Sequence, residues 1–267
     1  MASGFSSGLG AAPEDALASG PSNQSPVQQL NTAARTLGPL ERLRLLGDRV
    51  VGRLVFTTSF GLEDQVLAHF IHAAGLAIHY VTLDTGRLFP ETYGVWAATE
   101  QRYGIRVHAY YPEAPAVEQL VDAQGIDGFY ASTAARHACC NVRKVVPLRR
   151  ALRGASGWIT GLRADQSDDR QGIEFAAYDS EHELIKVNPL YDWSRDRVEA
   201  RAAMADVPLN PLHDRGFRSI GCAPCTRAVG PDEPERAGRW WWETEAAKEC
   251  GLHLTPDGRL VRLDGAR

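Results

Sequence analysis

Two features are missing from this chain: a long uncharged apolar run and an excess of positive charge. Charged residues interrupt every apolar stretch, whereas a transmembrane helix needs about 20 mainly apolar residues in succession. The formal net charge is -4 and the sequence pI is about 6.1, so the sequence lacks the general basic character of a nucleic-acid-binding protein. We therefore expect neither a membrane span nor a nucleic-acid partner, and an anionic ligand must meet a local group of basic residues.

Basic residues are also absent from residues 1–34, which are rich in Gly, Ser, Ala, Pro, Asn and Gln. A secretory signal would need a positive start and an apolar run of roughly 7–15 residues, and this segment has neither. We expect residues 1–34 to form a disordered tail. The protein is then expected to be cytoplasmic, where thiols stay reduced and clustered cysteines indicate metal binding or catalysis more often than disulfides.

Cysteine is scarce, with five residues in 267, but their spacing is informative. Cys139 and Cys140 are adjacent, Cys222 and Cys225 form a Cys-x-x-Cys pair, and Cys250 stands alone near the C-terminus. The two pairs have the character of metal ligands. A thiolate bound to metal is a poor attacking group, whereas an unpaired thiol in a polar segment is free to react. The pattern therefore predicts four ligands and one nucleophile.

The middle of the chain alternates short apolar strands with amphipathic helices. We expect strands at 53–58, 77–83, 106–111 and 157–161, with helices after residue 64, over 90–103 and from near the cysteine pair. Strand–helix repeats of this kind predict an α/β fold with a parallel sheet covered on both faces, and ligands bind such sheets at the carboxyl ends of the strands.

Two loops are expected at that edge. The turn Ser59–Asp64 would offer helix-start N–H groups, the flexible Gly61 and the Ser59 hydroxyl to an anion. It lacks the Gly-Lys-Ser/Thr ending of a Walker loop, and an ordinary capped helix start would look the same. The polar loop 83–93 follows the next strand. We place a nucleotide across both loops, with substrate-binding roles for Ser59, Gly61, Asp64, Leu83, Thr85 and Gly86.

With these motifs in their order, the chain resembles the assimilatory adenylyl-sulfate reductases. The resemblance runs from about residue 57 to residue 253, and its segments are 59–64, 83–93, 139–140, 161–167, 221–225 and 249–253. It implies an adenine nucleotide α-hydrolase-like fold and reduction of adenosine 5′-phosphosulfate (APS) to sulfite and AMP. A related branch acts on 3′-phosphoadenosine 5′-phosphosulfate and generally lacks the four paired cysteines.

Four thiolates suit either tetrahedral zinc or a [4Fe-4S] cluster, and their number does not separate the two. Zinc sites usually draw on spaced cysteines, whereas Cys139 and Cys140 are neighbours. Adjacent helical residues point about 100° apart, so both can reach one centre only if it is bulky or sits at a kinked helix end. This favours a cluster, and the resemblance implies one [4Fe-4S] cluster held by Cys139, Cys140, Cys222 and Cys225.

Basic residues follow the cysteine pair. The resemblance makes Lys144 the residue that links cluster and substrate, while we expect its basic neighbours in the run to lie on the surface. Arg163 is predicted at the carboxyl edge of the sheet, and Arg236 and Arg239 are matched by family arginines that bind phosphate or sulfate oxygens. Arg227 is a weaker candidate. We expect the three consecutive tryptophans at 240–242 to serve packing.

Cys250, between Lys248 and His253, is the expected nucleophile, with His253 assigned to the catalytic site. It would attack the sulfate sulfur, expel AMP and carry an S-sulfonate, which a second thiol would discharge as sulfite. Since no further unassigned cysteine remains and only residues 251–267 follow, the reductant is expected to be external. Thioredoxin is the expected donor, with glutaredoxin as the alternative.

The sequence predicts three parts: the tail 1–34, a nucleotide- and iron–sulfur-binding domain over 35–231, and a mobile catalytic segment over 232–267. It leaves open whether the chain forms a homo-oligomer. The nearest alternative function is the same reaction on the 3′-phosphorylated substrate. An iron–sulfur tRNA-thiolating enzyme would want a basic surface and a Ser-Gly-Gly loop, and a non-enzymatic iron–sulfur sensor would need neither Cys250 nor the arginines.

Overall fold

A computed structural model of the chain describes residue 1 and residues 24–167 and 170–243. Its regular elements run in the order α1 (Pro26–Ala34), α2 (Pro39–Arg49), β1 (Leu54–Thr57), α3 (Leu62–Ala74), β2 (His79–Leu83), α4 (Pro90–Tyr103), β3 (His108–Tyr110), α5 (Ala114–Gln124), α6 (Thr133–Cys140), α7 (Val146–Leu152), β4 (Gly157–Ile159), β5 (Ala176–Asp179), β6 (Leu184–Val187) and α8 (Arg195–Ala205).

The six strands form one sheet in the order β3-β2-β1-β4-β6-β5. The first five are parallel neighbours, and β5 pairs with β6 in the antiparallel sense. The expectation of a parallel sheet is therefore corrected at one edge. The cause is local: β5 and β6 are joined by a short turn, whereas a parallel pair needs a crossover of a dozen or more residues.

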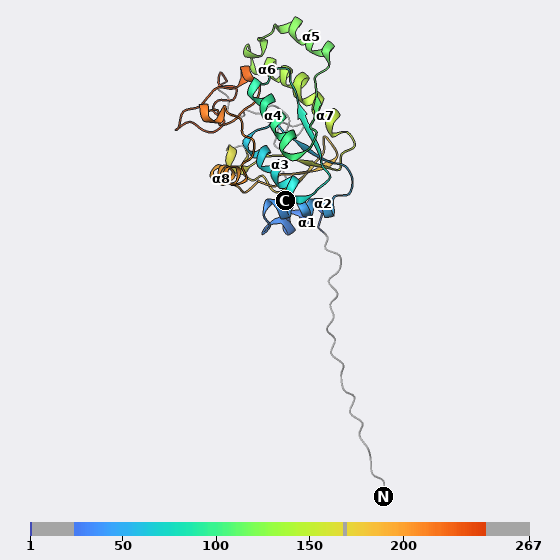
Figure 1. Ribbon diagram of the computed structural model, residues 1–267. Coiled ribbons are helices and arrows are strands. Elements are labelled where there is room, and N and C mark those ends of the chain that lie inside the picture. Colours follow the sequence, from blue (N-terminus) through green and yellow to red (C-terminus); the bar gives the residue numbers. More distant parts are fainter. Residues whose placement is uncertain (2–23, 168–169, 244–267) are drawn as a thin grey trace.

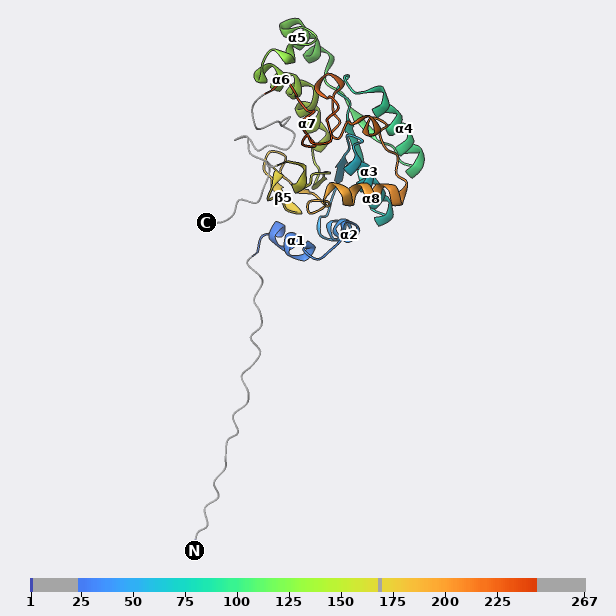
Figure 2. The same cartoon turned by 90° about the vertical axis from the view of Figure 1, so that its left-hand side faces the viewer.

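Side chains alternate along β1 between two buried layers. Leu54 and Phe56 belong to the larger core, which includes residues of α1, α2, α3, α4 and α8, whereas Val55 packs with α7 in the smaller core. This period-2 alternation is what a strand covered on both faces requires. Figures 1 and 2 show α1 and α2 together at one end of the molecule and α5 at the opposite end.

The predicted disordered tail is wrong for its last part, because Pro26–Ala34 is helical. Ser25 caps this helix through a capping box with Gln28, and Val27, Leu30 and Ala34 are buried. A capped helix with an apolar stripe at this spacing is stabilised by packing. The helix lies against β5, where Asn31 donates a hydrogen bond to the carbonyl of Ala176 at 2.9 Å.

The helical stretch from α6 to α7 is interrupted by a turn with π-helical hydrogen bonding. Between α6 and α7, residues Asn141–Val145 form a π-helical turn, directly after Cys140. Such turns are rare and occur often at functional sites. In the part of the chain that the structure describes, every helix is too short or too polar to traverse a bilayer.

Candidate active site

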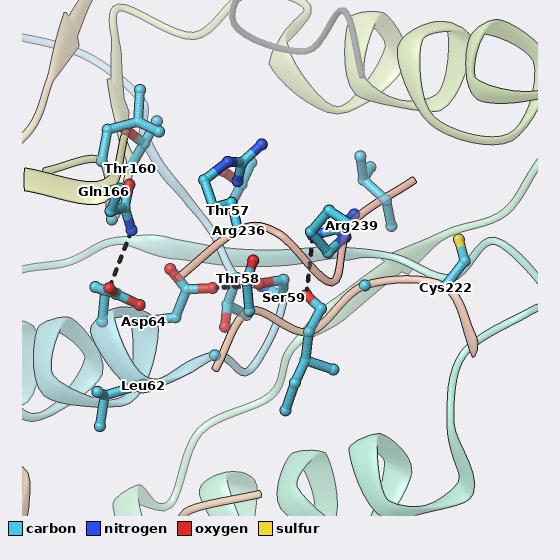
Figure 3. Close-up of a pocket in the computed structure, with 18 of the residues that line it drawn as sticks. Thr57, Thr58, Ser59, Leu62, Asp64, Thr160, Gln166, Cys222, Arg236 and Arg239 are labelled. Carbon is cyan, nitrogen blue, oxygen red and sulfur yellow. Dashed lines mark hydrogen bonds between the residues drawn. The ribbon is translucent and has the colours of Figure 1, made fainter. Parts of the chain in front are cut away.

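The principal cavity lies at the carboxyl ends of the strands. In sequence order, β2 and β3 are added on one side of β1, and β4 is then added on its other side. Open α/β sheets bind ligands at this switch point between β1 and β4. The cavity has a volume of about 220 Å³ and is lined by the ends of β1, β2 and β4 and the residues that follow them, together with residues 218–222, 235–236 and 239–240. Figure 3 shows Asp64 and Gln166 at one end of this pocket and Arg239 and Cys222 at the other.

The turn after β1 is shaped by Asp64. Its carboxylate accepts hydrogen bonds from the Ser59 amide at 2.6 Å and from the Ser59 hydroxyl at 2.9 Å. Phe60 takes a left-handed backbone conformation (φ 59°), which is strained for an aromatic residue, and its ring stacks on Trp96. Ser59, Gly61 and Asp64, which the sequence marked as candidate substrate-binding residues, all line the pocket. Burial raises the pKa of Asp64 to about 6.

The loop after β2 contributes two of its three predicted residues. Leu83 and Thr85 line the pocket, whereas Gly86 is not among the lining residues. Gly86 instead shapes the loop: it has a positive φ of 70°, and its amide donates to Asp84 at 2.9 Å. The hydroxyl of Thr85 lies 3.3 Å from the Cys222 sulfur. The loop therefore reaches from the pocket to the cysteine pairs.

The four paired cysteines converge on a second, small cavity. Cys139 and Cys140 come from the end of α6. Cys222 precedes the short turn Ala223–Cys225, and Cys225 ends it. Phe129 and Trp240 pack against them. Within the described residues, no three His, Cys, Asp or Glu side chains form a group that could hold a metal ion. Four cysteine sulfurs are a donor set that suits either a tetrahedral zinc ion or a [4Fe-4S] cluster.

Positive charge surrounds this cavity. Arg87, Arg136, Arg143 and Lys144 line it with the cysteines. Burial alone would raise the pKa of the Cys222 thiol, but Lys144, the Thr85 hydroxyl and two arginines outweigh burial and lower that pKa. Burial raises the pKa of Cys225 to about 12. The cavity thus joins four sulfur ligands to a cationic wall, which suits an anionic centre.

The expectation that the basic neighbours of Lys144 lie on the surface is wrong for two of them. Arg136 and Arg143 are 1% and 7% exposed. Arg143 donates to the Thr85 carbonyl at 2.7 Å, and Arg136 forms a buried ion pair with Glu243 at 2.8 Å. Burying a charge without a partner is costly, and both arginines have one. Lys144 and Cys222 line both cavities.

The two candidate arginines near the end of the described chain lie at the pocket. Arg236 and Arg239 are both among its lining residues. Arg239 is 7% exposed, and its guanidinium lies over the Trp240 ring at 4.7 Å. It also packs on Gly221, where an added Cβ would lie 2.3 Å from its Nη2. Only glycine at position 221 leaves room for this approach.

Arg163 requires a correction. It follows β4 at the expected edge, but its side chain is fully buried and it is not among the pocket-lining residues. Its guanidinium contacts Glu63 at 2.8 Å, Glu235 at 2.9 Å and Asp165 at 3.3 Å. Three carboxylates therefore contact the guanidinium of Arg163, which would otherwise be available to bind a substrate anion. Arg227 also lies outside the pocket lining and pairs with Glu233 at 2.6 Å.

Cys250 and His253 lie outside the described residues. Sequence reasoning missed three basic residues that line the pocket: Arg170, His213 and Arg218. Arg170 is 4% exposed and contacts Gln166. The Nδ1 of His213 donates to the Phe217 carbonyl at 2.8 Å, and burial lowers its pKa. Arg170 follows the loop after β4 and was recognisable by that place. His213 lies in the short 3₁₀ helix His213–Arg215 and Arg218 in the irregular chain after it, where no repeating sequence pattern marks a site.

The tryptophans have different surroundings. Trp240 is 1% exposed and packs beside the cysteines, as expected for a packing residue. Trp241 is 49% exposed, and Trp242 contacts the ring of Tyr130 at 4.4 Å between centroids. Although Trp241 is half exposed, its ring makes a T-shaped contact with Trp242, with the centroids 5.8 Å apart.

Comparison with known proteins is consistent with this geometry. Residues 53–228 match the phosphoadenosine phosphosulfate reductase domain family. The adenosine 5′-phosphosulfate reductase of Sinorhizobium fredii strain NGR234 is 52% identical, with 85% of this chain and 93% of that protein covered. That of Allochromatium vinosum is 50% identical, covering 77% and 80%.

A solved structure has the same fold. The phosphoadenylyl-sulfate reductase of Candida auris, crystallised with phosphate, superposes with a TM-score of 0.65 at 27% identity, covering 76% of this chain and 96% of that one. It bears out the expectation of an adenine nucleotide α-hydrolase-like fold. On the matched domain, the identity over most of the chain and this fold, the chain belongs to the phosphoadenosine phosphosulfate reductase family and groups there with the adenosine 5′-phosphosulfate reductases.

Proposed function

We propose that the protein reduces adenosine 5′-phosphosulfate to sulfite and AMP. The observation that carries the proposal is that Lys144 and Cys222 line both the pocket at the sheet edge and the four-cysteine cavity. A sulfonucleotide in the pocket would then have its anionic end beside Lys144. Relatives about 50% identical bear the name of this reductase, which supports the same substrate here.

The names of the relatives and the presence of all four paired cysteines support APS over its 3′-phosphorylated form as the substrate. Figure 3 shows Asp64 and Gln166 at one end of the pocket and Arg239 towards Cys222 at the other. Lys144 also lies near Cys222, because both line the four-cysteine cavity and the lysine lowers the pKa of that thiol. A phosphosulfate group is stabilised at the cationic end. The nucleoside then extends towards the opposite end, where its ribose hydroxyls would meet polar side chains such as Asp64 and Gln166.

The chemistry is assigned to Cys250. Its thiolate attacks the sulfate sulfur, the bond between that sulfur and the bridging oxygen breaks, and AMP leaves with the electron pair. A thiol of an external protein then attacks the Cys250 sulfur, forms a mixed disulfide and releases sulfite. We assign thioredoxin as this donor, His253 to the same catalytic segment and the cytoplasm as the compartment.

We assign one [4Fe-4S] cluster to Cys139, Cys140, Cys222 and Cys225. Their convergence on one cavity with a cationic wall supports this assignment. When bound, the cluster supplies a fixed anionic centre beside the pocket. The contribution of the chain is Lys144, which lines both cavities. Its ammonium would stabilise the negative charge that develops on the departing groups.

A reductant-free turnover tests the function. Wild-type protein mixed with APS should release one AMP per active site and gain about 80 Da, the mass of a sulfonate, on Cys250. Cys250→Ser is the matched control, because it keeps the four paired cysteines and should form no adduct. Reduced thioredoxin should then discharge sulfite from the wild-type adduct. An adduct on Cys250→Ser, or preference for the 3′-phosphorylated substrate, would contradict the proposal.

A further inference from the structure

A long loop carries Arg236 over the pocket. It leaves the cysteine region at Thr226 and returns at Arg239, where these two residues form an isolated antiparallel bridge. The Arg227 amide donates to the Gly238 carbonyl at 3.0 Å, which closes the base of the loop. Gly238 is required there, since a Cβ would lie 2.2 Å from the Arg227 carbonyl oxygen. The base of the loop is therefore fixed independently of its tip.

The tip is held by Glu235, the residue before Arg236. The Glu235 carboxylate accepts two hydrogen bonds from Arg163 Nη2, at 2.9 Å and 3.2 Å, across 72 positions of sequence. A second cation, Arg195, lies 3.5 Å from the same carboxylate. The Glu235 side chain is 12% exposed and that of Arg163 is fully buried, so solvent does little to screen this pair.

The Arg163 side chain is also held in place by contacts other than the one with Glu235. Its Nε donates to Glu63 at 2.8 Å, and its Nη1 contacts Asp165 and the Trp193 carbonyl. Glu63 belongs to the first turn of α3, next to the Ser59–Asp64 turn. One guanidinium thus connects the turn after β1 with the loop that carries Arg236. Because the Arg fork is planar and rigid, it transmits geometry as well as charge.

We propose that the Arg163–Glu235 pair is a positioning device that holds Arg236 in the substrate pocket. The proposal rests on the proposed function, because it assigns Arg236 to the phosphosulfate group. Arg163 and Glu235 then act through Arg236 and touch no substrate atom that the reaction changes. Displacing the loop tip would move the Arg236 fork away from the phosphosulfate oxygens, so that substrate is bound less tightly.

Glu235→Gln tests this with a matched control two residues away. Glu233 also pairs with an arginine on the same loop, but that pair is exposed. With Glu235→Gln, the KM for APS should rise about tenfold while kcat stays within about threefold, because uniform binding is lost. Glu233→Gln should leave both constants within about twofold of wild type. A partly misfolded variant would instead lower the apparent kcat at unchanged KM.

A double-mutant cycle separates positioning from general stability. The AMP affinity of wild type, Glu235→Gln, Arg236→Ala and the double variant is measured by calorimetry. If Glu235 acts through Arg236, Glu235→Gln should have no further effect once Arg236 is Ala. Additive losses, or an AMP affinity of Glu235→Gln equal to that of Glu233→Gln, would overturn the inference. Arg163→Lys, which keeps the charge and loses the fork, repeats the cycle if Glu235→Gln fails to fold.

Hydrogen exchange provides a readout without ligand. Amides of residues 228–237 should exchange faster in Glu235→Gln than in Glu233→Gln, because the tip loses its anchor. Equal exchange in the two variants would overturn the positioning role whatever the kinetics. A wild-type protein that binds neither AMP nor APS would contradict the proposed function, and the exchange experiment would still decide the inference.

Discussion

The guanidinium of Arg136 and the carboxylate of Glu243, 107 residues apart, form a two-pronged ion pair inside the protein. Nε and Nη2 of the arginine each donate to a different carboxylate oxygen at 2.8 Å, and the two side chains are 1% and 4% exposed. The guanidinium also lies over the Trp240 ring at 4.6 Å. The pair thus ties α6, just before the cysteines, to the segment that follows the pocket arginines.

Breaking this pair should destabilise the protein strongly. Glu243→Gln leaves the buried Arg136 charge without its carboxylate, and removal of one partner of a buried pair typically costs about 3–5 kcal/mol. Urea unfolding should show this loss. The matched control is Glu181→Gln, whose arginine partner, Arg149, is 55% exposed; it should cost less than about 1 kcal/mol. Equal losses in the two variants would contradict a structural role for the buried pair.

Lys144→Gln should lower kcat at least several tens-fold while the iron content stays near that of wild type. The ammonium acts on charge between the cysteine cavity and the pocket and is not itself a ligand. Steady-state kinetics and iron and sulfide analysis of the same sample measure both quantities. Arg149→Gln, on the exposed side of α7, should change neither. Loss of iron from Lys144→Gln would show that the lysine has a structural role at the cysteines.

Asp64→Asn should make the unfolding free energy less dependent on pH. The pKa of Asp64 is raised to about 6 by burial, above the roughly 3.9 of an unfolded chain. A raised carboxyl pKa means that the protonated form is favoured in the folded state, so stability is full below pH 4 and is lost as pH rises through 6. The loss is roughly 3 kcal/mol at pH 7.

Asn cannot ionise, and its oxygen can still accept from the Ser59 amide. The difference in unfolding free energy between Asp64→Asn and wild type should therefore grow in favour of the variant from pH 4 to pH 7. Urea titrations at several pH values measure it. The exposed Asp48→Asn is the control. A difference that does not change with pH would show that Asp64 is charged without cost in the folded protein.

Gly221→Ala should weaken AMP and APS binding about tenfold, since the new methyl group would displace the Arg239 fork and lose a charge-assisted contact. Calorimetry with AMP measures the effect. Gly94→Ala is the control, because an added Cβ there meets nothing within 4 Å, and it should bind as wild type does. Unchanged affinity of Gly221→Ala would remove Arg239 from the binding site.

Local pattern predicted much of the fold and the site. The alternation around Val55 and the helical spacing after Gly61 each come from neighbours in sequence, and so do the two loops at the strand ends. The antiparallel edge strand β5 depends on a pairing between two short segments. The hydrophobic periodicity of the sequence does not predict such a pairing. The helix Pro26–Ala34 did carry a signal, its capping box, but the composition of the preceding residues concealed it.

Charged residues were predicted less well, for a physical reason. An arginine has the same sequence signature whether it binds substrate, as proposed for Arg236, or is buried against carboxylates, as Arg163 is. Its partners Glu63 and Glu235 lie 100 and 72 positions away. Only the fold decides which of these groups meet.

The π-helical turn Asn141–Val145 amounts to one residue more than an α-helix would need over the same rise. That additional residue offsets the angular register of α6 from that of α7 by about 100°. The cysteines can therefore face their cavity while Leu148, Ala151 and Leu152 face the sheet. A continuous α-helix could not direct the cysteines to their cavity and these three apolar side chains to the sheet at the same time. Removing one residue from this turn should turn the cysteine pair out of line with the Cys222–Cys225 pair while leaving the composition of the site unchanged.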